Sequence, residues 1–298
     1  MPLYGSFKTL RDTNFMIMHM TLGSNDLERA AHFYDAVMPI LNHARAPISL
    51  DNFLAYAPVS GESSGADTGQ IEATGRITPF LCVCRPYDGQ PASRGNGFHI
   101  AWVAADKRAV ETFHATALAK GGSDEGAPGY RPHYSDDYYA AYVRDPDGNK
   151  LQAVFYEQGR KAGPGGSILS HVTLPFDNLE AGLAFYEPVF ATLGISRVPG
   201  CESPGEDYAF SRGGAECPVA YVQRPFDGKA AARGNGQHVS FFAETSAQVD
   251  RFFDIALALG AQDDGPPGNR PSYTQPYYAA YVRDPAGTKI QAVCKTGN

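Results

Sequence analysis

The chain has 298 residues, of which 43% are hydrophobic and 19% are charged, and its net charge is −7. This length suits two domains of roughly 150 residues each, and the composition is that of a soluble globular protein. The negative charge, without any local cluster of Lys and Arg, argues against nucleic acid as a partner. The N-terminal segment lacks the apolar core of a signal peptide, and no apolar run approaches a membrane span. We therefore expect a cytoplasmic protein with no membrane partner.

The chain consists of two repeats, which the copied motifs described below define, and each repeat is predicted to form two units with the order strand, helix, strands. Runs of strand length alternate with segments that place apolar residues at helical spacing. Capping-box patterns at residues 25–28 and 177–180 precede the first helix of each repeat, and Pro39 and Pro188 should end or kink these helices. In chain order, the expected strands are 15–22, 53–57, 79–84, 98–103, 139–144, 150–156, 168–174, 208–210, 218–223, 237–243, 278–283 and 289–294, and the expected helices are 27–41, 107–120, 179–193 and 246–259.

The two repeats are recognised by copied motifs. YYAAYVRDP occupies residues 138–146 and returns unchanged at 277–285, which is an offset of 139. The blocks HMTL and HVTL, which begin at His19 and His171, are 152 residues apart, so the second copy is thirteen residues shorter between the two motifs. This period is too long for a solenoid and indicates a tandem domain duplication. We predict a first repeat at residues 1–158, a linker at 159–167 and a second repeat at 168–298.

Polar residues that recur on strands in both repeats are the candidates for a site. Side chains alternate faces along a strand, so His99 shares a face with Gly97 and Ala101, which leave open space. Packing alone rarely asks for histidine or glutamine, and the other histidines of the first repeat have no counterpart. Two histidines and one oxygen donor, each on a separate strand, make a workable facial metal site. The candidates are His19, His99 and Gln152 in the first repeat and His171, His238 and Gln291 in the second.

Three sequence blocks carry a resemblance to a known superfamily. MHMTLGSNDLERAAHFYDAV (18–37), GNGFHIAWVA (95–104) and YYAAYVRDPDGNKLQAV (138–154), with their second-repeat partners, resemble the vicinal oxygen chelate superfamily. Its members include glyoxalase I, extradiol dioxygenases, and fosfomycin and bleomycin resistance proteins. The resemblance runs from about residue 15 to the C-terminus and is specific to the superfamily but to no single activity.

The resemblance implies both a fold and a cofactor. The fold is α+β, with four βαβββ modules whose curled mixed sheets form cleft-bearing half-barrels. The metal ligands are the first-strand histidine, the histidine after GNG, and the last-strand position held here by Gln152 and Gln291. The ion is Fe²⁺, Mn²⁺, Zn²⁺ or Ni²⁺. The family's metal enzymes usually have Glu at the last-strand position. Because an amide adds no negative charge and accepts no proton, Gln should weaken metal binding and removes the carboxylate base of glyoxalase-type chemistry.

The ligands combine into sites in two ways that the sequence leaves open. An exchange of modules, as in the fosfomycin-type arrangement, joins a first-strand histidine of one repeat to the other two ligands of the other repeat. Self-contained repeats would instead keep all three ligands of each repeat together. The exchanged sites are His171/His99/Gln152 and His19/His238/Gln291, and the self-contained sites are His19/His99/Gln152 and His171/His238/Gln291.

Loops rich in Gly, Pro and Tyr at residues 121–137 and 260–276 supply the other candidates. Aromatic rings with an arginine can hold a planar or anionic small molecule, although a tyrosine-lined hairpin that packs its own loop is an equal interpretation. Asp145 and Asp284 border the hairpin turns, and we interpret them as structural. The substrate-binding candidates are Arg131, Tyr134, Tyr138, Arg270, Tyr273 and Tyr277.

The resemblance supports two principal functional hypotheses. The first is a metal-dependent enzyme, either a lyase or isomerase or a dioxygenase, whose small substrate chelates the ion through vicinal oxygens. The second is a metal-free protein that binds or sequesters a small molecule, as in the bleomycin-resistance branch, and a structural pseudoenzyme is a third reading. The sequence names no catalytic residue. We expect a monomer, since a fused pair of repeats need not associate further, with a homodimer as the alternative.

Overall fold

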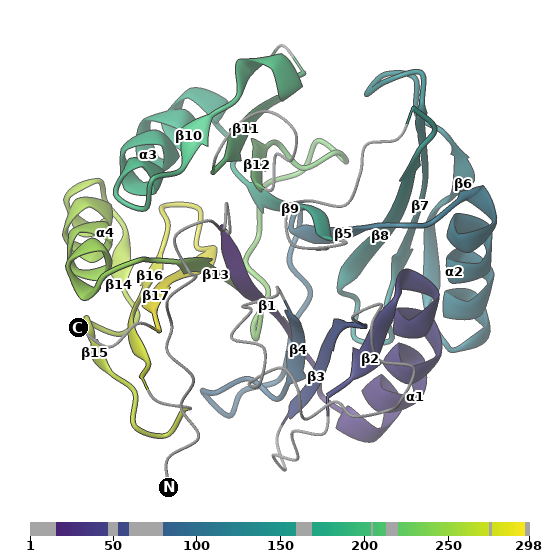
Figure 1. The fold of residues 1–298 in the computed structure, drawn as a ribbon, viewed down its shortest axis with the longest axis horizontal. Coiled ribbons are helices and arrows are strands. Elements are labelled where there is room, and N and C mark those ends of the chain that lie inside the picture. Colours follow the sequence, from purple (N-terminus) through teal and green to yellow (C-terminus); the bar gives the residue numbers. More distant parts are fainter. Residues whose placement is uncertain are drawn as a thin grey trace, which may run out of the picture.

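Two curled, mixed β-sheets with α-helices on their outer sides make up the protein (Figure 1). The computed structural model describes residues 16–46, 53–59, 80–158, 169–203, 205–212, 220–273 and 276–295. The sheets curl without closing into barrels, and the predicted α+β class is confirmed. No helix in these ranges is both long and apolar enough to cross a bilayer.

The elements form four modules, two in each repeat. Module 1 contains β1 (Ile17–Gly23), α1 (Leu27–Val37), a 3₁₀ turn (Met38–Leu41), β2 (His43–Arg45), β3 (Phe53–Pro58) and β4 (Phe80–Cys84). Module 2 contains β5 (His99–Val103), α2 (Lys107–Ala119), β6 (Ser123–Tyr130), β7 (Tyr138–Arg144) and β8 (Lys150–Tyr156). Module 3 contains β9 (Leu169–Pro175), α3 (Leu179–Ala191), β10 (Ser196–Arg197), a 3₁₀ turn (Pro199–Cys201), β11 (Asp207–Ser211) and β12 (Ala220–Gln223). Module 4 contains β13 (His238–Phe242), α4 (Ser246–Ala258), β14 (Gln262–Asp263), β15 (Gly268–Asn269), β16 (Tyr278–Arg283) and β17 (Lys289–Cys294).

Each sheet combines one module from each repeat. The nine-stranded sheet has the order β14–β16–β17–β13–β1–β4–β3–β2, with β15 also paired to β16, and joins module 4 to module 1. The eight-stranded sheet has the order β10–β11–β12–β9–β5–β8–β7–β6 and joins module 3 to module 2. The antiparallel pairs β1–β13 and β5–β9 form the two joints. The helices stay together by repeat, with α1 against α2 on one side of the molecule and α3 against α4 on the other (Figure 1).

Two further copied motifs connect the repeats: RPYDG (85–89), which returns as RPFDG (224–228), and RGNG (94–97 and 233–236). The side-chain amide of Asn96 donates to Asp227 at 3.0 Å, and the equivalent amide of Asn235 donates to Asp88 at 3.1 Å. Gly236 has a φ of +89°, and a Cβ at this position would lie 2.5 Å from the Cα of the last residue of β1. Only glycine tolerates both that conformation and that approach. Both repeats therefore need these motifs for their mutual contact.

The sequence interpretation missed the strand β6 and also the shorter strands β2, β10, β14 and β15. β6 lies inside the segment predicted as a loop at 121–137. Its residues, SDEGAPGY, are mostly exposed and show no alternation of apolar and polar side chains. Hydrogen bonds to β7, with two irregularities in register, make this segment an edge strand. A strand of this kind is formed by its hydrogen bonds to the neighbouring strand, so a local hydrophobic pattern cannot reveal it.

The helix ends differ from the prediction in two details. Helix α1 is capped by Asp26, whose carboxylate accepts the N–H groups of Glu28 and Arg29, one residue later than the predicted box. Helix α3 is likewise capped by Asn178. The first helix ends before Pro39, as expected, because α1 stops at Val37 and Pro39 lies in the 3₁₀ turn that follows; α3, in contrast, continues through Pro188. Few residues of α3 follow Pro188, so the single missing hydrogen bond is tolerated.

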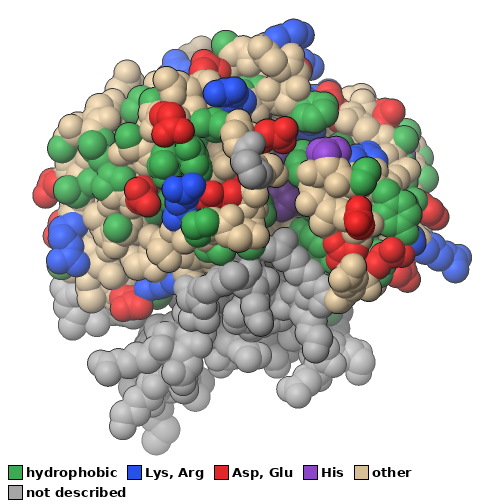
Figure 2. Space-filling view, turned by 90° about the horizontal axis from the view of Figure 1, so that it is seen from above, with side chains coloured by type: hydrophobic (Ala, Val, Ile, Leu, Met, Phe, Trp, Pro, Cys, Tyr) green, Lys and Arg blue, Asp and Glu red, His purple; other side chains and the backbone are tan. Residues whose placement is uncertain are grey.

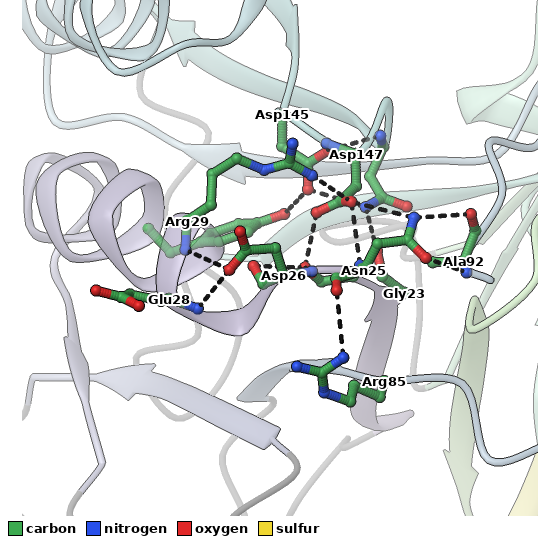
Figure 3. Close-up of polar contacts among 12 residues, drawn as sticks. Gly23, Asn25, Asp26, Glu28, Arg29, Arg85, Ala92, Asp145 and Asp147 are labelled. Atoms are coloured by element: carbon green, nitrogen blue, oxygen red, sulfur yellow. Dashed lines mark hydrogen bonds and ion pairs between the residues drawn. The ribbon is translucent and has the colours of Figure 1, made fainter. Parts of the chain in front are cut away.

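A buried polar cluster ties the hairpin turn of module 2 to the first helix of module 1 (Figure 3). Tyr34 donates to Asp145 Oδ2 at 2.6 Å, and the backbone N–H groups of Asp147 and Asn149 donate to Oδ1 at 2.9 and 2.8 Å. Asp147 in turn accepts from the Arg29 guanidinium at 2.8 Å. The structural role predicted for Asp145 is confirmed, because this carboxylate fastens two modules of the same repeat.

The second repeat keeps only the centre of this cluster. Tyr186 from α3 donates to Asp284 Oδ2 at 2.5 Å, and the N–H of Thr288 donates to Oδ1 at 2.7 Å. Ala286 stands where the first repeat has the arginine-bound aspartate, so no ion pair can form at that position. The tyrosine–aspartate contact and the backbone hydrogen bond from the turn to the aspartate are thus the parts that recur in both repeats.

Asp284 should make stability depend on pH. Burial raises the pKa of this carboxyl to about 6. The folded protein then binds more protons than the unfolded chain between about pH 4 and 6, so the contribution of Asp284 to stability falls as the pH rises through that window. We expect the difference in unfolding free energy between wild type and Asp284→Asn to change by about 3 kcal/mol across it. Urea titrations at several pH values would measure this difference, and Asp254→Asn on the exposed side of α4 should show no comparable change.

Candidate functional site

The strand pair β5–β9, which joins the repeats, carries two of the predicted histidines. His171 lies opposite Ala101 and His99 lies opposite Thr173, so the histidines are diagonal neighbours on one face of the sheet. Gln152 reaches the same face from β8, whose parallel pairing with β5 places it beside Ala101. We name His99, His171 and Gln152 the cavity centre.

The same arrangement recurs at the other joint, β1–β13. His19 lies opposite Ser240, and His238 lies opposite Thr21. Gln291 lies beside Ser240 on β17. We name His19, His238 and Gln291 the second centre. Of the two combinations that the sequence left open, the structure brings together the exchanged one, in which each centre draws side chains from both repeats.

A chain of hydrogen bonds orders the cavity centre. The Nε2 atom of His99 is 3.1 Å from Gln152 Oε1 and 3.2 Å from Thr173 Oγ1. The amide of Gln152 donates to Tyr138 Oη at 2.5 Å. The rings of His99 and His171 meet edge to face, with centroids 5.4 Å apart. The glutamine oxygen is therefore held against the histidine ring in a fixed orientation.

The second centre leaves polar atoms without partners. The Nε2 atoms of His19 and His238 are 3.1 Å apart, and the Gln291 amide donates to Tyr277 Oη at 3.0 Å. Among the described residues, the buried Oε1 of Gln291 and Nδ1 of His19 have no hydrogen-bond partner. A buried acceptor with no partner costs free energy unless a ligand or water satisfies it.

Two features of the centres fit a divalent metal ion. A nitrogen ligand lies about 2.1 Å from such an ion, so two ligands at a right angle are about 3 Å apart. The 3.1 Å between the His19 and His238 nitrogens matches that spacing, and the unpartnered oxygen of Gln291 offers a third donor. Burial lowers the pKa of His19 to about 3 and holds the pKa values of His99 and His238 well below the usual range. The rings are therefore neutral, as ligation requires.

The charges around the two centres are less favourable for a metal ion than the spacing of the ligand atoms. Within the described ranges, no group of three or more His, Cys, Asp or Glu side chains is arranged to hold a metal ion. After burial and the neighbouring histidine, Lys150 lowers the pKa of His99, and Lys289 does the same to His238. A bound cation would meet neutral donors and positive neighbours, so its affinity should be lower than at a site with a carboxylate.

A cavity of about 310 Å³ adjoins the cavity centre, between modules 2 and 3. His99 and His171 form part of its wall, and its described lining contains no Lys or Arg. Figure 2 shows histidine side chains in and beside a recess on one face of the molecule. The remaining wall is largely aromatic and acidic, with Tyr134, Tyr138, Tyr142, Tyr156, Tyr221, Asp137, Glu202 and Asp207.

The predicted substrate-binding tyrosines lie at both centres. Tyr134 and Tyr138 line the cavity, and their ring centroids are 5.2 Å apart. Tyr273 and Tyr277 form the corresponding pair beside the second centre, with centroids 5.0 Å apart. In each repeat the second tyrosine of the pair receives the glutamine amide hydrogen bond, so the aromatic pair and the histidines form one structural unit.

The guanidinium groups of the two predicted arginines form hydrogen bonds within their own loops. The guanidinium of Arg131 donates to the carbonyl of Ala127 at 2.8 Å, and that of Arg270 donates to the carbonyl of Pro266 at 2.6 Å. Each also lies over a tyrosine ring of the neighbouring strand, 5.7 Å from its centroid. Arg131 is not among the residues that line the cavity, so the cavity offers no guanidinium to an anionic ligand.

Sequence reasoning missed Asp207, Tyr142 and Tyr221. Tyr142 could have been found, because alternation along the copied strand YYAAYVR puts it on the same face as Tyr138. Tyr221 and Asp207 have no such signal, because the first repeat has neither residue at the matching position. Asp207 is only 8% exposed, and burial raises its pKa to about 6. A buried acid therefore shares the cavity with the histidine pair.

Comparisons with known proteins agree with this architecture. A crystal structure of glyoxalase I from Zea mays is similar, with a TM-score of 0.65 and 17% identity over 94% of this chain and 92% of that chain. A putative dioxygenase from Bacillus subtilis subsp. subtilis str. 168 has a TM-score of 0.60 and 16% identity over 95% and 86% of the two chains. No curated protein matches the sequence. The model of the family described as "Glyoxalase/Bleomycin resistance protein/Dioxygenase superfamily" matches residues 16–153 and 168–292, and the chain belongs to this superfamily.

Proposed function

We propose that this protein is a metal-dependent enzyme that acts in the cavity on a small molecule with neighbouring oxygen atoms. The observation that supports the proposal is the convergence of His99, His171 and Gln152 from three strands at the wall of the cavity. These residues would hold Fe²⁺, Mn²⁺, Zn²⁺ or Ni²⁺, which supplies Lewis-acid polarisation of the ligand's oxygens when bound. The reaction is of the lyase, isomerase or dioxygenase type.

The chain's own residues shape the space beside the histidines. Tyr142 meets the His99 ring edge to face with centroids 6.1 Å apart, and Tyr221 meets the His171 ring in the same way at 5.2 Å. Aromatic surfaces on both sides of the histidine pair favour a flat ligand and displace water from its faces. The hydrogen bond between Gln152 and Tyr138 keeps the glutamine oxygen turned toward His99.

A second candidate function is metal-free binding or sequestration of a small molecule. The observation that favours it is the hydrogen bonding in the cavity centre, where His99 and Tyr138 form hydrogen bonds with the two ends of the Gln152 amide. The absence of a carboxylate from both centres, within the described residues, points the same way. In this case the tyrosine-lined cavity would bind the ligand by stacking and hydrogen bonds alone.

The metal content of protein purified without an affinity tag tests the first proposal. We expect up to two ions per chain, and loss of one centre's ion from each of the variants His171→Ala and His19→Ala. The double variant His99→Ala/His171→Ala should lose no more metal than either single variant, because both residues belong to the same centre. Circular dichroism would show that each variant is folded.

A metal-free result has a separate consequence. If folded wild-type protein takes up no Mn²⁺, Fe²⁺, Zn²⁺ or Ni²⁺ at neutral pH, the metal-dependent proposal is wrong. Ligand-induced stabilisation of that metal-free protein, lost in Tyr134→Ala but kept in His19→Ala, would then support the binding function. The His19 variant is the matched control because it alters the other sheet.

A further inference from the structure

A buried carboxylate on the wall of the cavity has no cation beside it. Asp207, at the start of β11, lines the cavity and is 8% exposed. Its Oδ1 atom accepts the backbone N–H of Ser203 at 3.0 Å. The charged side chains that act on its pKa are two further acids, Glu202 and Glu206, and both raise it. Within the described ranges, no Lys, Arg or His forms an ion pair with it. A buried charge without a partner is costly, so a ligand that supplies a positive charge gains from this position.

The other two acids of the wall are already engaged. Glu202 forms a two-pronged ion pair with Arg197, with N–O distances of 2.7 and 2.8 Å. Asp137 accepts a hydrogen bond from the hydroxyl of Ser135. Asp137 and Asp207 are thus the wall acids without an ion pair among the described residues, and Asp207 is the more deeply buried of the two.

The fold does not require an acid at this position. Gln223 and Cys84 each precede the copied RPFDG or RPYDG motif, and their neighbours across the sheet are Asp207 and Phe53. The two sheets are otherwise alike, yet only the one beside the cavity has the carboxylate. Asp207 thus belongs to the chemistry of this cavity rather than to the packing of the sheet.

An aromatic ring lies near the carboxylate. Tyr134 comes from module 2, across the cavity from β11, and its pKa is raised first by burial and then by the charges of Asp207 and Glu206. Its ring packs on Tyr138 with centroids 5.2 Å apart. A carboxylate next to tyrosine rings is a favourable environment for an organic ammonium group, which gains both an ion pair and a cation–π contact.

We propose that the cavity takes a small organic cation, whose protonated amine binds Asp207 beside Tyr134 while its oxygen-bearing end faces His99 and His171. The inference rests on the proposed function only in placing the ligand's oxygens at the histidine pair. It adds the charge of the substrate class, which the histidines and glutamine do not specify.

Because the pKa of Asp207 is raised, the preference of the cavity for a cation should depend on pH. Burial raises this pKa to about 6, the Ser203 hydrogen bonds oppose the rise, and Glu202 and Glu206 add to it. A cation binds the ionised carboxylate, so its affinity should fall about tenfold between pH 7 and pH 5. A neutral ligand of the same shape should lack this component.

Three catechol probes that differ at one end test the inference by calorimetry under argon. Dopamine carries an ammonium group, 4-ethylcatechol is neutral and 3,4-dihydroxyphenylacetate carries a carboxylate. We expect wild type to bind dopamine about 10- to 100-fold more tightly than 4-ethylcatechol. Asp207→Asn keeps the shape and the acceptor for Ser203, and it should abolish this preference while binding 4-ethylcatechol as wild type does. Glu206→Gln, which removes an exposed charge one residue away, should keep the preference.

The outcomes separate this inference from the proposed function. If the carboxylate probe binds as well as dopamine, or if Asp207→Asn keeps the preference, the inference is overturned. Binding of all three probes that is lost in His171→Ala would still support the proposed function in that case. Failure of every probe to bind the folded wild type would count against both.

Discussion

Replacement of Gln152 by Glu is expected to tighten the binding of Mn²⁺ or Zn²⁺ at the cavity centre by about 100-fold. The new carboxylate adds a negative charge next to His99, in place of an amide oxygen that lies 3.1 Å from its ring nitrogen. Tyr138 would then donate its hydroxyl hydrogen to the carboxylate rather than accept from the amide. Isothermal titration calorimetry of metal-free protein with each ion measures the change.

Two variants control for the added charge. Gln223→Glu places a carboxylate in the same cavity wall but on a strand without a candidate ligand, and it should leave the affinity within a few-fold of wild type. Gln291→Glu should instead tighten the second centre. Equal affinities in Gln152→Glu and Gln223→Glu would contradict the assignment of Gln152 as a ligand.

Substitution of Asp145 by Ala is expected to lower the free energy of unfolding by about 3–5 kcal/mol. The change leaves the Tyr34 hydroxyl, the Asn149 amide and two backbone N–H groups without their acceptor in a buried place. It also loosens the contact between the first helix and the hairpin turn of module 2. Urea unfolding followed by circular dichroism gives the free energy.

The Tyr34→Phe variant separates one hydrogen bond from the whole cluster. It should cost about 1–2 kcal/mol, and its effect should largely vanish in the Asp145→Ala background, because the acceptor is already gone. Asp254→Ala, on the exposed side of α4, should cost less than about 0.5 kcal/mol. A similar loss in Asp254→Ala and Asp145→Ala would show that the buried cluster contributes nothing specific.

The candidate site could be predicted only where the duplication repeated it. His99 and His238, and Gln152 and Gln291, stand out because two independent copies keep a polar residue on a strand. Asp207 has Phe53 as its structural counterpart and an unremarkable sequence context, so no internal comparison marks it. The alignment of these two residues becomes visible only through their cross-strand partners.

The predicted substrate-binding residues show the same limit. Tyr134 and Tyr138 line the cavity, whereas the guanidinium of Arg131 is held by the carbonyl of Ala127. The sequence placed Arg131 and Tyr134 in one loop that leads directly into Tyr138, but the direction of each side chain depends on how β6 and β7 pair. β6 itself is polar and exposed, so its existence could not be inferred from hydrophobic alternation.

The sequence by itself determined the two repeats, the helices and the main strands of each module, and the recurring histidines and glutamines. These features are local, because hydrophobic periodicity and copied motifs can be read without knowing any distant contact. Only the tertiary structure decided that His171 joins His99 and that His19 joins His238. This choice depends on contacts between residues far apart in the chain, which local patterns do not reveal. The hydrogen bonds of Asn96 to Asp227 and of Asn235 to Asp88 are such contacts, and they join the two repeats in the exchanged arrangement that the fold adopts.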